Sequence, residues 1–171
     1  MQLNYKLREY ISMLDNIERM STCNRQAACI ILKDYYVVGI GYNGSLKKDH
    51  HCKDVGCLLV DNNNEYGSNG HRSCVRTIHA EINAILNGLV LSSVCRENLV
   101  CLTTYLPCLN CLKALLQIGI TSIYFKKFYK DNNRDLFINS LIDYISDSIK
   151  FFHVLSDGIN DELYLFEYVE L

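Results

Sequence analysis

The sequence predicts an α/β sandwich, in which helices cover a central sheet, built as a single domain over residues 1–171. Short runs rich in β-branched and aromatic residues alternate along the chain with segments whose apolar residues recur at helical spacing. Two clusters of metal-ligating residues each fall where a helix is expected to begin. A chain of 171 residues can form one domain with its own core, and we find no internal repeat or linker.

The N-terminal part is expected to form a helix followed by a hairpin. An amphipathic helix is indicated by apolar residues at helical spacing: Leu3, Leu7, Tyr10, Ile11, Leu14 and Ile17. The polar segment 21–24 ends this pattern. Two β-rich runs, 27–32 and 36–40, flank a turn at Lys33 and Asp34 and predict a hairpin. The sequence Gly-Tyr-Asn-Gly then ends the second strand in a loop.

The rest of the chain alternates between the two kinds of element. A long polar stretch over 45–73 is expected to be a loop, and a loop of this length is usually functional or fixed by a ligand. Further helices are expected at 78–86, 107–118 and 136–149, and further strands at 99–104, 122–125 and 151–155. The tail from residue 161 alternates like a strand, but its apolar residues also fit one side of a helix, so both remain open.

Composition excludes several classes of protein. Apolar residues make up 49% and charged residues 21% of the chain, as in globular domains. The net charge is -2 and no basic block occurs, which argues against a nucleic-acid partner. The sequence contains no run of about 18 apolar residues, which a membrane-spanning helix would need. The charged N-terminus is unlike a signal peptide. We therefore expect a cytoplasmic protein without a membrane partner, in which nine cysteines favour metal ligands over disulfides.

Two short motifs, H-A-E and P-C-x-x-C, carry the chemistry. His79, Cys108 and Cys111 offer three ligands to a zinc ion and leave a fourth position for water, which is typical of a catalytic zinc site. Glu81 can transfer protons without binding the metal, provided that it lies in the first turn of its helix. H-x-E followed by P-C-x-x-C is the signature of zinc-dependent nucleobase deaminases.

The surroundings of the motifs make the catalytic interpretation specific. Alone, C-x-x-C is also found in zinc ribbons and redox pairs, and a lone H-A-E means little. Pro107 is the only proline in the chain and is suited to the first turn of a helix. Cys108 and Cys111 would then share one helical face at the positive end of the helix dipole, which favours the thiolates that zinc requires.

Further segments resemble the deoxycytidylate (dCMP) deaminase family, most closely its bacterial competence-operon branch. The matching segments are 21–23, 41–45, 51–57 and 74–85, and the likeness extends from about residue 21 to residue 129. The loop Gly-Tyr-Asn-Gly separates this family from cytidine, tRNA-adenosine and guanine deaminases. The resemblance implies a three-layer α-β-α sandwich of the cytidine deaminase type with a central mixed sheet of about five strands. It also implies that dCMP and water are converted to dUMP and ammonia, for thymidylate synthesis.

The resemblance also implies roles for individual residues. Glu81 would be the acid/base, and Asn43 would contact the sugar or phosphate of the nucleotide. Ala80, Arg25 and Tyr129 fall at substrate-binding or subunit-contacting positions. Considered by their own chemistry, Asn43 could be a turn residue and Arg25 a surface charge.

The family's assembly and regulation are expected to extend to this chain. The resemblance implies a homo-oligomer, specifically a hexamer, that is activated by dCTP and inhibited by dTTP. The segment 46–49 replaces a Pro/Gly-rich turn of the family, and an extra segment, 63–70, lengthens the following loop. Both departures fall near the nucleotide and effector loops, so they bear on regulation and substrate preference more than on zinc chemistry.

A second zinc is expected from cysteines that match positions of the competence-type branch: Cys23, Cys52, Cys57 and Cys74. Four thiolates suit a closed, structural zinc, which would fix the long loop. His71 could replace one of them, and simple burial of the thiols is the alternative. Three further cysteines in apolar contexts are expected to be core residues: Cys29, Cys95 and Cys101.

Three functions are compatible with these observations. The first is a dCMP deaminase, and the second is a deaminase of another cytosine or purine substrate. The low net charge and the Gly-Tyr-Asn-Gly loop favour the first over the second. The third is a non-catalytic, zinc-stabilised competence-type protein, and the presence of Glu81 argues against it because a structural metal does not need that carboxylate.

Overall fold

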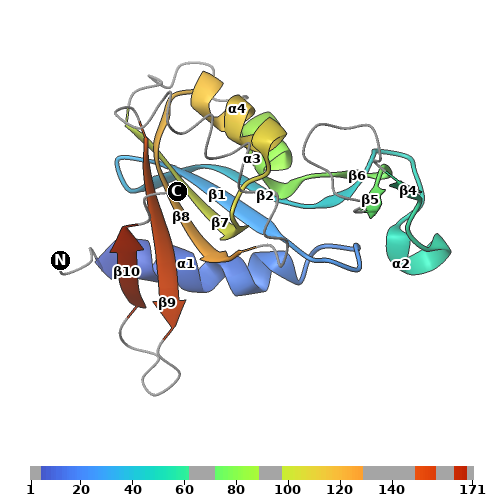
Figure 1. Ribbon diagram of the computed structural model, residues 1–171, viewed down its shortest axis with the longest axis horizontal. Coiled ribbons are helices and arrows are strands. Elements are labelled where there is room, and N and C mark those ends of the chain that lie inside the picture. The colour runs from blue at the N-terminus through green and yellow to red at the C-terminus, as the bar shows by residue number, and fades with distance from the viewer. Residues whose placement is uncertain (1–4, 62–71, 89–97, 129–148, 157–163, 169–171) are drawn as a thin grey trace.

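A mixed sheet lies between one helix on one face and two helices on the other. The computed structural model describes residues 5–61, 72–88, 98–128, 149–156 and 164–168. Helix α1 (Tyr5–Glu18) covers one face of the sheet, and α3 (Ala80–Gly88) and α4 (Leu109–Gln117) cover the other (Figure 1). This arrangement confirms the predicted three-layer α-β-α sandwich. No described helix is long and apolar enough to cross a membrane.

The sheet has six strands in the order β10-β9-β8-β7-β1-β2. They are β1 (Ala28–Lys33), β2 (Tyr36–Tyr42), β7 (Leu99–Tyr105), β8 (Ile120–Lys127), β9 (Lys150–Ser156) and β10 (Tyr164–Tyr168). The β7–β8 and β8–β9 pairs are parallel, and the other pairs are antiparallel. Five of these strands were expected. β10 is the sixth and shows that this part of the tail is a strand. The helix expected at 136–149 and Tyr129 lie outside the described residues, except for Ile149.

Apolar side chains form one layer on each side of the sheet. Successive residues of β1 point to opposite faces, so Ile30 packs toward α1 and Ile31 toward α3 and α4. The stripe on α1 that the helical spacing indicated is buried: Leu7, Ile11, Leu14 and Ile17. Cys29 and Cys101 are core residues, as expected, with their sulfur atoms 3.6 Å apart.

The hairpin between β1 and β2 is present, with its turn one residue later than expected. Lys33 pairs with Tyr36, so the two-residue loop is Asp34 and Tyr35 rather than Lys33 and Asp34. Both loop residues have positive φ, at 49° and 64°, as the tight hairpin turn that fits the twist of the strands requires. The Tyr10 hydroxyl donates to the Tyr35 carbonyl at 3.1 Å and ties this turn to α1.

The long polar segment is not a plain loop, because it contains short elements at one end of the molecule. Helix α2 (Cys52–Val55) and the strands β4 (Leu59–Asp61) and β5 (Arg72–Cys74) form what we call the cysteine lobe, on the right of Figure 1. A two-residue ladder between β3 (Gly44–Ser45) and β6 (Thr77–Ile78) connects the lobe to the sandwich. Propensity alone gave no signal for elements this short.

Helix α3 lies so close to strand β2 that glycine is required at the contact. A Cβ atom on Gly41 would overlap the Ala80 carbonyl oxygen and the Ala84 amide nitrogen, and one on Gly39 would lie 2.5 Å from the Ala84 carbonyl oxygen. Gly88 meets the Val38 carbonyl in the same way. The backbone of α3 therefore packs directly against the backbone of β2, and this contact fixes the distance between α3 and the sheet.

Two asparagine side chains on α3 add hydrogen bonds to this contact. The Asn83 and Asn87 amides, one turn apart, donate to the carbonyls of Tyr42 and Ile40 at 2.8 Å each. These bonds satisfy carbonyl groups of β2, which is an edge strand of the sheet. The helix therefore has both a fixed distance and a fixed register against β2.

We predict that Gly41→Ala destabilises the protein by about 3 kcal/mol, because backbone atoms of α3 cannot move away without breaking the contact. Gly44→Ala is the matched control, since a Cβ there meets no atom within 4 Å, and its effect should stay within about 1 kcal/mol. Urea unfolding of both variants measures the difference. Equal stability of the two variants would show that the close approach of α3 to β2 is not required.

Candidate active site and metal centres

Two helix N-termini bring the three expected zinc ligands together. His79 directly precedes α3, and its carbonyl accepts the Asn83 amide at 3.0 Å, the first bond of that helix. Cys108 is the N-cap of α4, with φ −68° and ψ 163°, and Cys111 lies in the first turn. Pro107 therefore precedes the cap and lies two positions before the first turn, in which we expected it. An extended Cys108 still allows both thiols to face His79.

The ligand atoms are spaced as zinc requires. The Nδ1 atom of His79 lies 3.5 Å from the Cys108 sulfur and 3.3 Å from the Cys111 sulfur. All three ligand atoms lie within 4.8 Å of one another. Tetrahedral zinc, with bonds of about 2.3 Å to sulfur and about 2.0 Å to nitrogen, separates such ligands by about 3.5 Å. The donor set and its spacing therefore fit a zinc ion.

The two thiols of this group differ strongly in acidity. A hydrogen bond from Cys111 and the nearby His79 lower the pKa of Cys108 to about 4. The same hydrogen bond, together with burial, raises the pKa of Cys111. A single negative charge is therefore favoured on the pair while no metal is present. Zinc prefers two thiolates, so binding should release the Cys111 proton.

Glu81 lies in the first turn of α3, as its proposed role requires. Only 4% of its surface is exposed, and its carboxyl contacts the Cys111 thiol. Burial raises the pKa of Glu81 above the usual value for a glutamate. A buried carboxyl beside a candidate metal site is suited to take up and release protons during a reaction.

Asn43 fastens the segment 21–27 to the end of β2. Its side-chain amide donates to the Arg25 carbonyl at 2.6 Å, and its side-chain oxygen accepts the Ala27 amide at 2.8 Å. The main-chain amide of Asn43 donates to the Ala27 carbonyl at 3.1 Å. These bonds give Asn43 a structural role in the loop, and its contact with a nucleotide stays a prediction.

The other residues expected at the substrate site lie in different settings. Ala80 is buried between His79 and Glu81 at the start of α3, and Arg25 is exposed on the loop that Asn43 holds. Tyr129 lies outside the described residues. Ala80 therefore lies beside the candidate ligand His79 and Arg25 lies on the loop that Asn43 holds, and the substrate-binding roles of both residues stay predictions.

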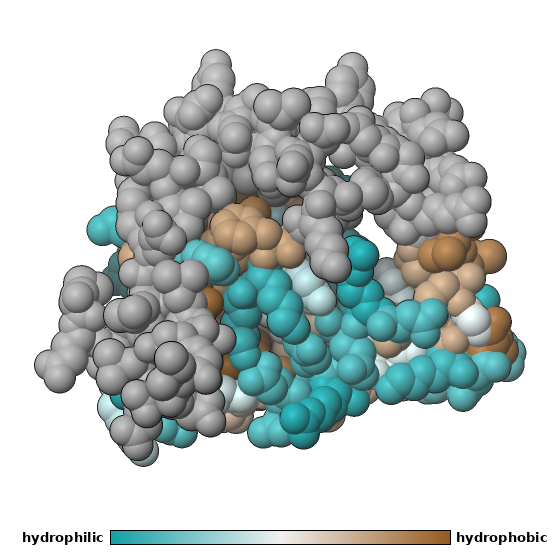
Figure 2. Space-filling model, turned by 60° about the horizontal axis from the view of Figure 1, so that its bottom comes forward, coloured by the Kyte–Doolittle hydropathy of each residue, from teal (hydrophilic) through white to brown (hydrophobic). Residues whose placement is uncertain are grey.

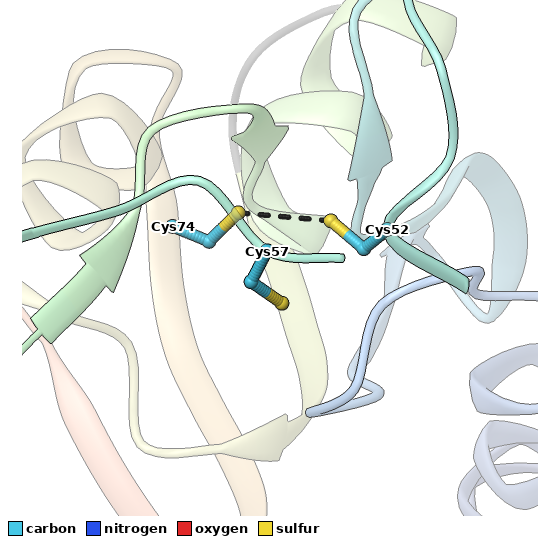
Figure 3. A group of neighbouring side chains, drawn as sticks. All are labelled: Cys52, Cys57 and Cys74. Atoms are coloured by element: carbon cyan, nitrogen blue, oxygen red, sulfur yellow. Dashed lines mark hydrogen bonds between the residues drawn. The ribbon is translucent and has the colours of Figure 1, made fainter. Parts of the chain in front are cut away.

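Three cysteines of the predicted second zinc site converge in the cysteine lobe (Figure 3). The ligand atoms of Cys52, Cys57 and Cys74 lie within 4.8 Å of one another, and the sulfurs of Cys52 and Cys74 are 3.6 Å apart. Cys23 is buried beside the group and hydrogen-bonds to the Cys52 thiol. Another expected ligand, His71, lies outside the described residues. We call Cys23, Cys52, Cys57 and Cys74 the cysteine cluster.

Hydrogen bonds directed at sulfur suit the cysteine cluster to a metal. Burial raises the pKa of Cys52 to about 12. Burial acts in the same direction on Cys74, but bonds from the Arg76 and Leu58 amides and from the Cys52 thiol outweigh it and lower its pKa. The Asn24 side-chain amide donates to the Cys57 sulfur at 3.2 Å. Such donors orient thiolate ligands around zinc, and the donor set fits that metal.

Sequence reasoning did not identify two residues that organise this region. Ser21 is fully buried and hydrogen-bonds to Asn43, while Asn24 supports Cys57. Neither residue belongs to a periodic pattern or to a ligand spacing. Their only signal was their place beside Cys23 in a segment shared with the family.

Comparison with known proteins identifies the family. Residues 4–127 match the cytidine and deoxycytidylate deaminase zinc-binding region. The chain belongs to this family. ComE operon protein 2 of Bacillus subtilis is 37% identical over 111 residues, which cover 64% of this chain and 53% of that protein. The deoxycytidylate deaminase of Saccharomyces cerevisiae is 29% identical over 112 residues, or 66% of this chain and 34% of that enzyme.

The fold of this chain is shared with solved structures. A dCMP deaminase from the cyanophage S-TIM5, solved with dCMP and dUMP, superposes with a TM-score of 0.61 at 21% identity, covering 88% of this chain and 98% of that one. The matches to the curated relatives span 53% of the Bacillus protein and 34% of the yeast enzyme. The comparisons confirm the resemblance to the family and the fold, and they show that the chain contains the zinc-binding region of that family.

We predict that the purified protein carries about two zinc ions per chain, one at His79, Cys108 and Cys111 and one at the cysteine cluster. Cys52→Ser should remove about one zinc without altering the other, because the two groups share no ligand. Cys29→Ala is the control, since this buried thiol belongs to neither group. Elemental analysis measures the content. A single zinc per chain, unchanged by Cys52→Ser, would reject the second site.

Proposed function

We propose that this deaminase hydrolyses dCMP to dUMP and ammonia and thereby supplies dUMP for thymidylate synthesis. The observation that carries this proposal is the buried carboxyl of Glu81 beside the three zinc ligands. A purely structural site does not need this carboxylate, which argues against a non-catalytic competence-type protein. The Gly-Tyr-Asn-Gly loop and the likeness to two yeast deoxycytidylate deaminases favour a cytosine nucleotide over another base.

In the proposed deamination, the zinc ligands hold the metal and Glu81 transfers the protons. When bound, zinc supplies a Lewis acid that makes water nucleophilic near neutral pH. Water adds to the carbon that bears the amine, and Glu81 takes a proton from that water and passes it to the ring nitrogen. Glu81 next takes the second proton of the added water, from the hydroxyl now on that carbon, and delivers it to the amine. The carbon–oxygen double bond forms as the carbon–nitrogen bond breaks, and the amine leaves as ammonia. Its burial keeps the proton near the reacting atoms instead of losing it to solvent.

A 5′-monophosphate substrate needs hydrogen-bond donors and a nearby cation. Arg76 already pairs with Asp49, with 2.5 Å between Nη1 and Oδ1. Arg25 lies on the loop whose backbone Asn43 holds, so its position is tied to the proposed nucleotide contact. We therefore assign the phosphate to the Arg25 and Asn43 side of the site.

Assembly and regulation are the remaining part of the proposal. We propose a homo-oligomer, specifically a hexamer, that dCTP activates and dTTP inhibits. Apolar side chains gather at the cysteine-lobe end in Figure 2, where Val55, Leu58, Leu59 and Val75 are each about half exposed. Such a surface provides apolar area for a subunit contact. Effectors would act by binding the active and inactive arrangements with different affinity.

Glu81→Gln should retain zinc and lose activity about 1,000-fold, because the amide removes proton transfer but none of the metal ligands. Zinc content and the rate of ammonia release are measured on the same preparation. Cys29→Ala is the control, and it should remain active. Full activity of Glu81→Gln would contradict the proposed mechanism.

Asn43→Ala should raise KM for dCMP about tenfold, since it removes the proposed nucleotide contact and loosens the Arg25 loop. Deoxycytidine, which lacks the phosphate, should be a much poorer substrate of the unaltered protein. The comparison uses kcat/KM for both substrates. If deoxycytidine proved equal to dCMP, the assignment of a phosphate site would be wrong.

Light scattering and initial rates test the assembly. We expect a hexamer whose dCMP saturation curve is sigmoidal and shifts toward lower substrate with dCTP and higher substrate with dTTP. A monomer with a hyperbolic curve that ignores both triphosphates would show that the altered segment 46–49 accompanies loss of the regulation.

A further inference from the structure

Ser21 is a buried polar residue at the junction between the cysteine lobe and the active site. Its side chain has no exposed surface. The Ser21 hydroxyl donates to the Asn43 carbonyl at 2.7 Å and accepts the Cys23 amide at 3.1 Å. One hydroxyl therefore bonds both to a residue of the cysteine cluster and to the loop proposed to contact the nucleotide.

The cysteine lobe holds the backbone around Ser21. The Lys53 ammonium of α2 donates to the Ser21 carbonyl at 3.0 Å, and the Lys53 amide donates to the Thr22 carbonyl at 3.1 Å. The His51 ring hydrogen-bonds to the Thr22 hydroxyl at 3.0 Å. Because Cys52 lies between these two lobe residues, an ordered metal site would also order the segment that carries Ser21.

The active-site side of the junction is equally well connected. Asn43 holds the Arg25 carbonyl and both main-chain groups of Ala27. The preceding residue, Tyr42, accepts a hydrogen bond from Asn83 on α3, the helix that carries Glu81. Hydrogen bonds thus connect α2 to Ser21, Ser21 to Asn43 and Tyr42 to α3, and the peptide bond between Tyr42 and Asn43 completes the connection.

We propose that Ser21 is a positioning residue that couples the cysteine cluster to the nucleotide-binding side of the active site. Metal at the cluster would hold α2 and Cys23 in place. Through its bonds to Cys23 and Asn43, Ser21 would then fix the position of Asn43 and of the loop that carries Arg25. By reciprocity, nucleotide binding strengthens metal retention at the cluster. The inference rests on the proposed function for its kinetic consequence, but its structural consequence can be measured without a substrate.

Amide hydrogen exchange tests the coupling in the zinc-loaded protein. Ser21→Ala should accelerate exchange of the Asn43 and Ala27 amides about two- to tenfold, because the bond that anchors their loop is lost. The Leu112 amide, which bonds to the Cys108 carbonyl in α4, should be unchanged. Unchanged exchange at both loop amides would overturn the proposal, whatever the protein's activity.

Steady-state kinetics test the consequence for substrate. Ser21→Ala should raise KM for dCMP about two- to tenfold while kcat changes less than about twofold, since the zinc ligands and Glu81 are untouched. Thr22→Ala is the matched control, because it loses the His51 contact but no bond to Asn43. An equal rise in KM for both variants would mean that the lobe is merely loosened, which would contradict a specific role for Ser21.

Combining Ser21→Ala with Cys57→Ser separates coupling from two independent effects. Cys57→Ser weakens the cluster, so alone it should raise KM and accelerate exchange at Asn43. With Ser21→Ala already present it should add little, because the connection is already broken. If the effects of the two substitutions on KM and on exchange at Asn43 multiply in full in the double variant, the proposal is wrong. If Ser21→Ala fails to fold by circular dichroism, Cys57→Ser alone decides: unchanged exchange at Asn43 would overturn the coupling.

A deaminase assay distinguishes failure of the proposed function from failure of the coupling through Ser21. If no cytosine nucleotide is turned over by the zinc-loaded protein, the proposed function fails, and the exchange measurements still decide whether Ser21 connects the two regions. If dCMP is turned over but exchange and KM do not respond to Ser21→Ala, the function stands and the coupling is wrong.

Discussion

The close approach of α3 to β2 is the constraint on which the active site depends. Glycines at 39, 41 and 88 let the two backbones touch, and Asn83 and Asn87 fix their register. His79 directly precedes α3 and Glu81 lies in its first turn, so this one contact sets the distance of both residues from the sheet. None of these glycines and asparagines is among the expected metal ligands or nucleotide contacts.

The second half of the site arises from the parallel part of the sheet. Strand β7 ends at Tyr105, and α4 begins four residues later with its N-terminus toward that of α3. Two helix N-termini then face the same small volume, where they favour negative charge on thiolate ligands. The low pKa of Cys108 and the raised pKa of Glu81 arise from this geometry, one through hydrogen bonds and the other through burial.

Patterns that repeat along the chain predicted the positions of most of the described helices and strands, and the spacing of the two motifs predicted that His79, Cys108 and Cys111 lie together. These patterns depend on residues close together in the sequence: the stripe on α1, the β-rich runs and the spacing of Cys108 and Cys111. The turn at Asp34 and Tyr35 lies one residue later than expected, and α4 begins two residues later than expected, because the ends of elements depend on the backbone angles of single residues. The short elements of the cysteine lobe and the role of Ser21 were missed because they depend on contacts between segments distant in sequence.

The central claim is that zinc at His79, Cys108 and Cys111, with Glu81 beside it, deaminates dCMP. An ammonia-release assay of the zinc-loaded protein with dCMP, CMP, deoxycytidine and dCTP tests it most directly, with the metal-depleted protein as the reference. We predict one ammonia and one dUMP for each dCMP consumed, a clear preference for dCMP, and loss of activity on metal removal. No ammonia from any of the four substrates, with zinc confirmed in the site, would contradict the account.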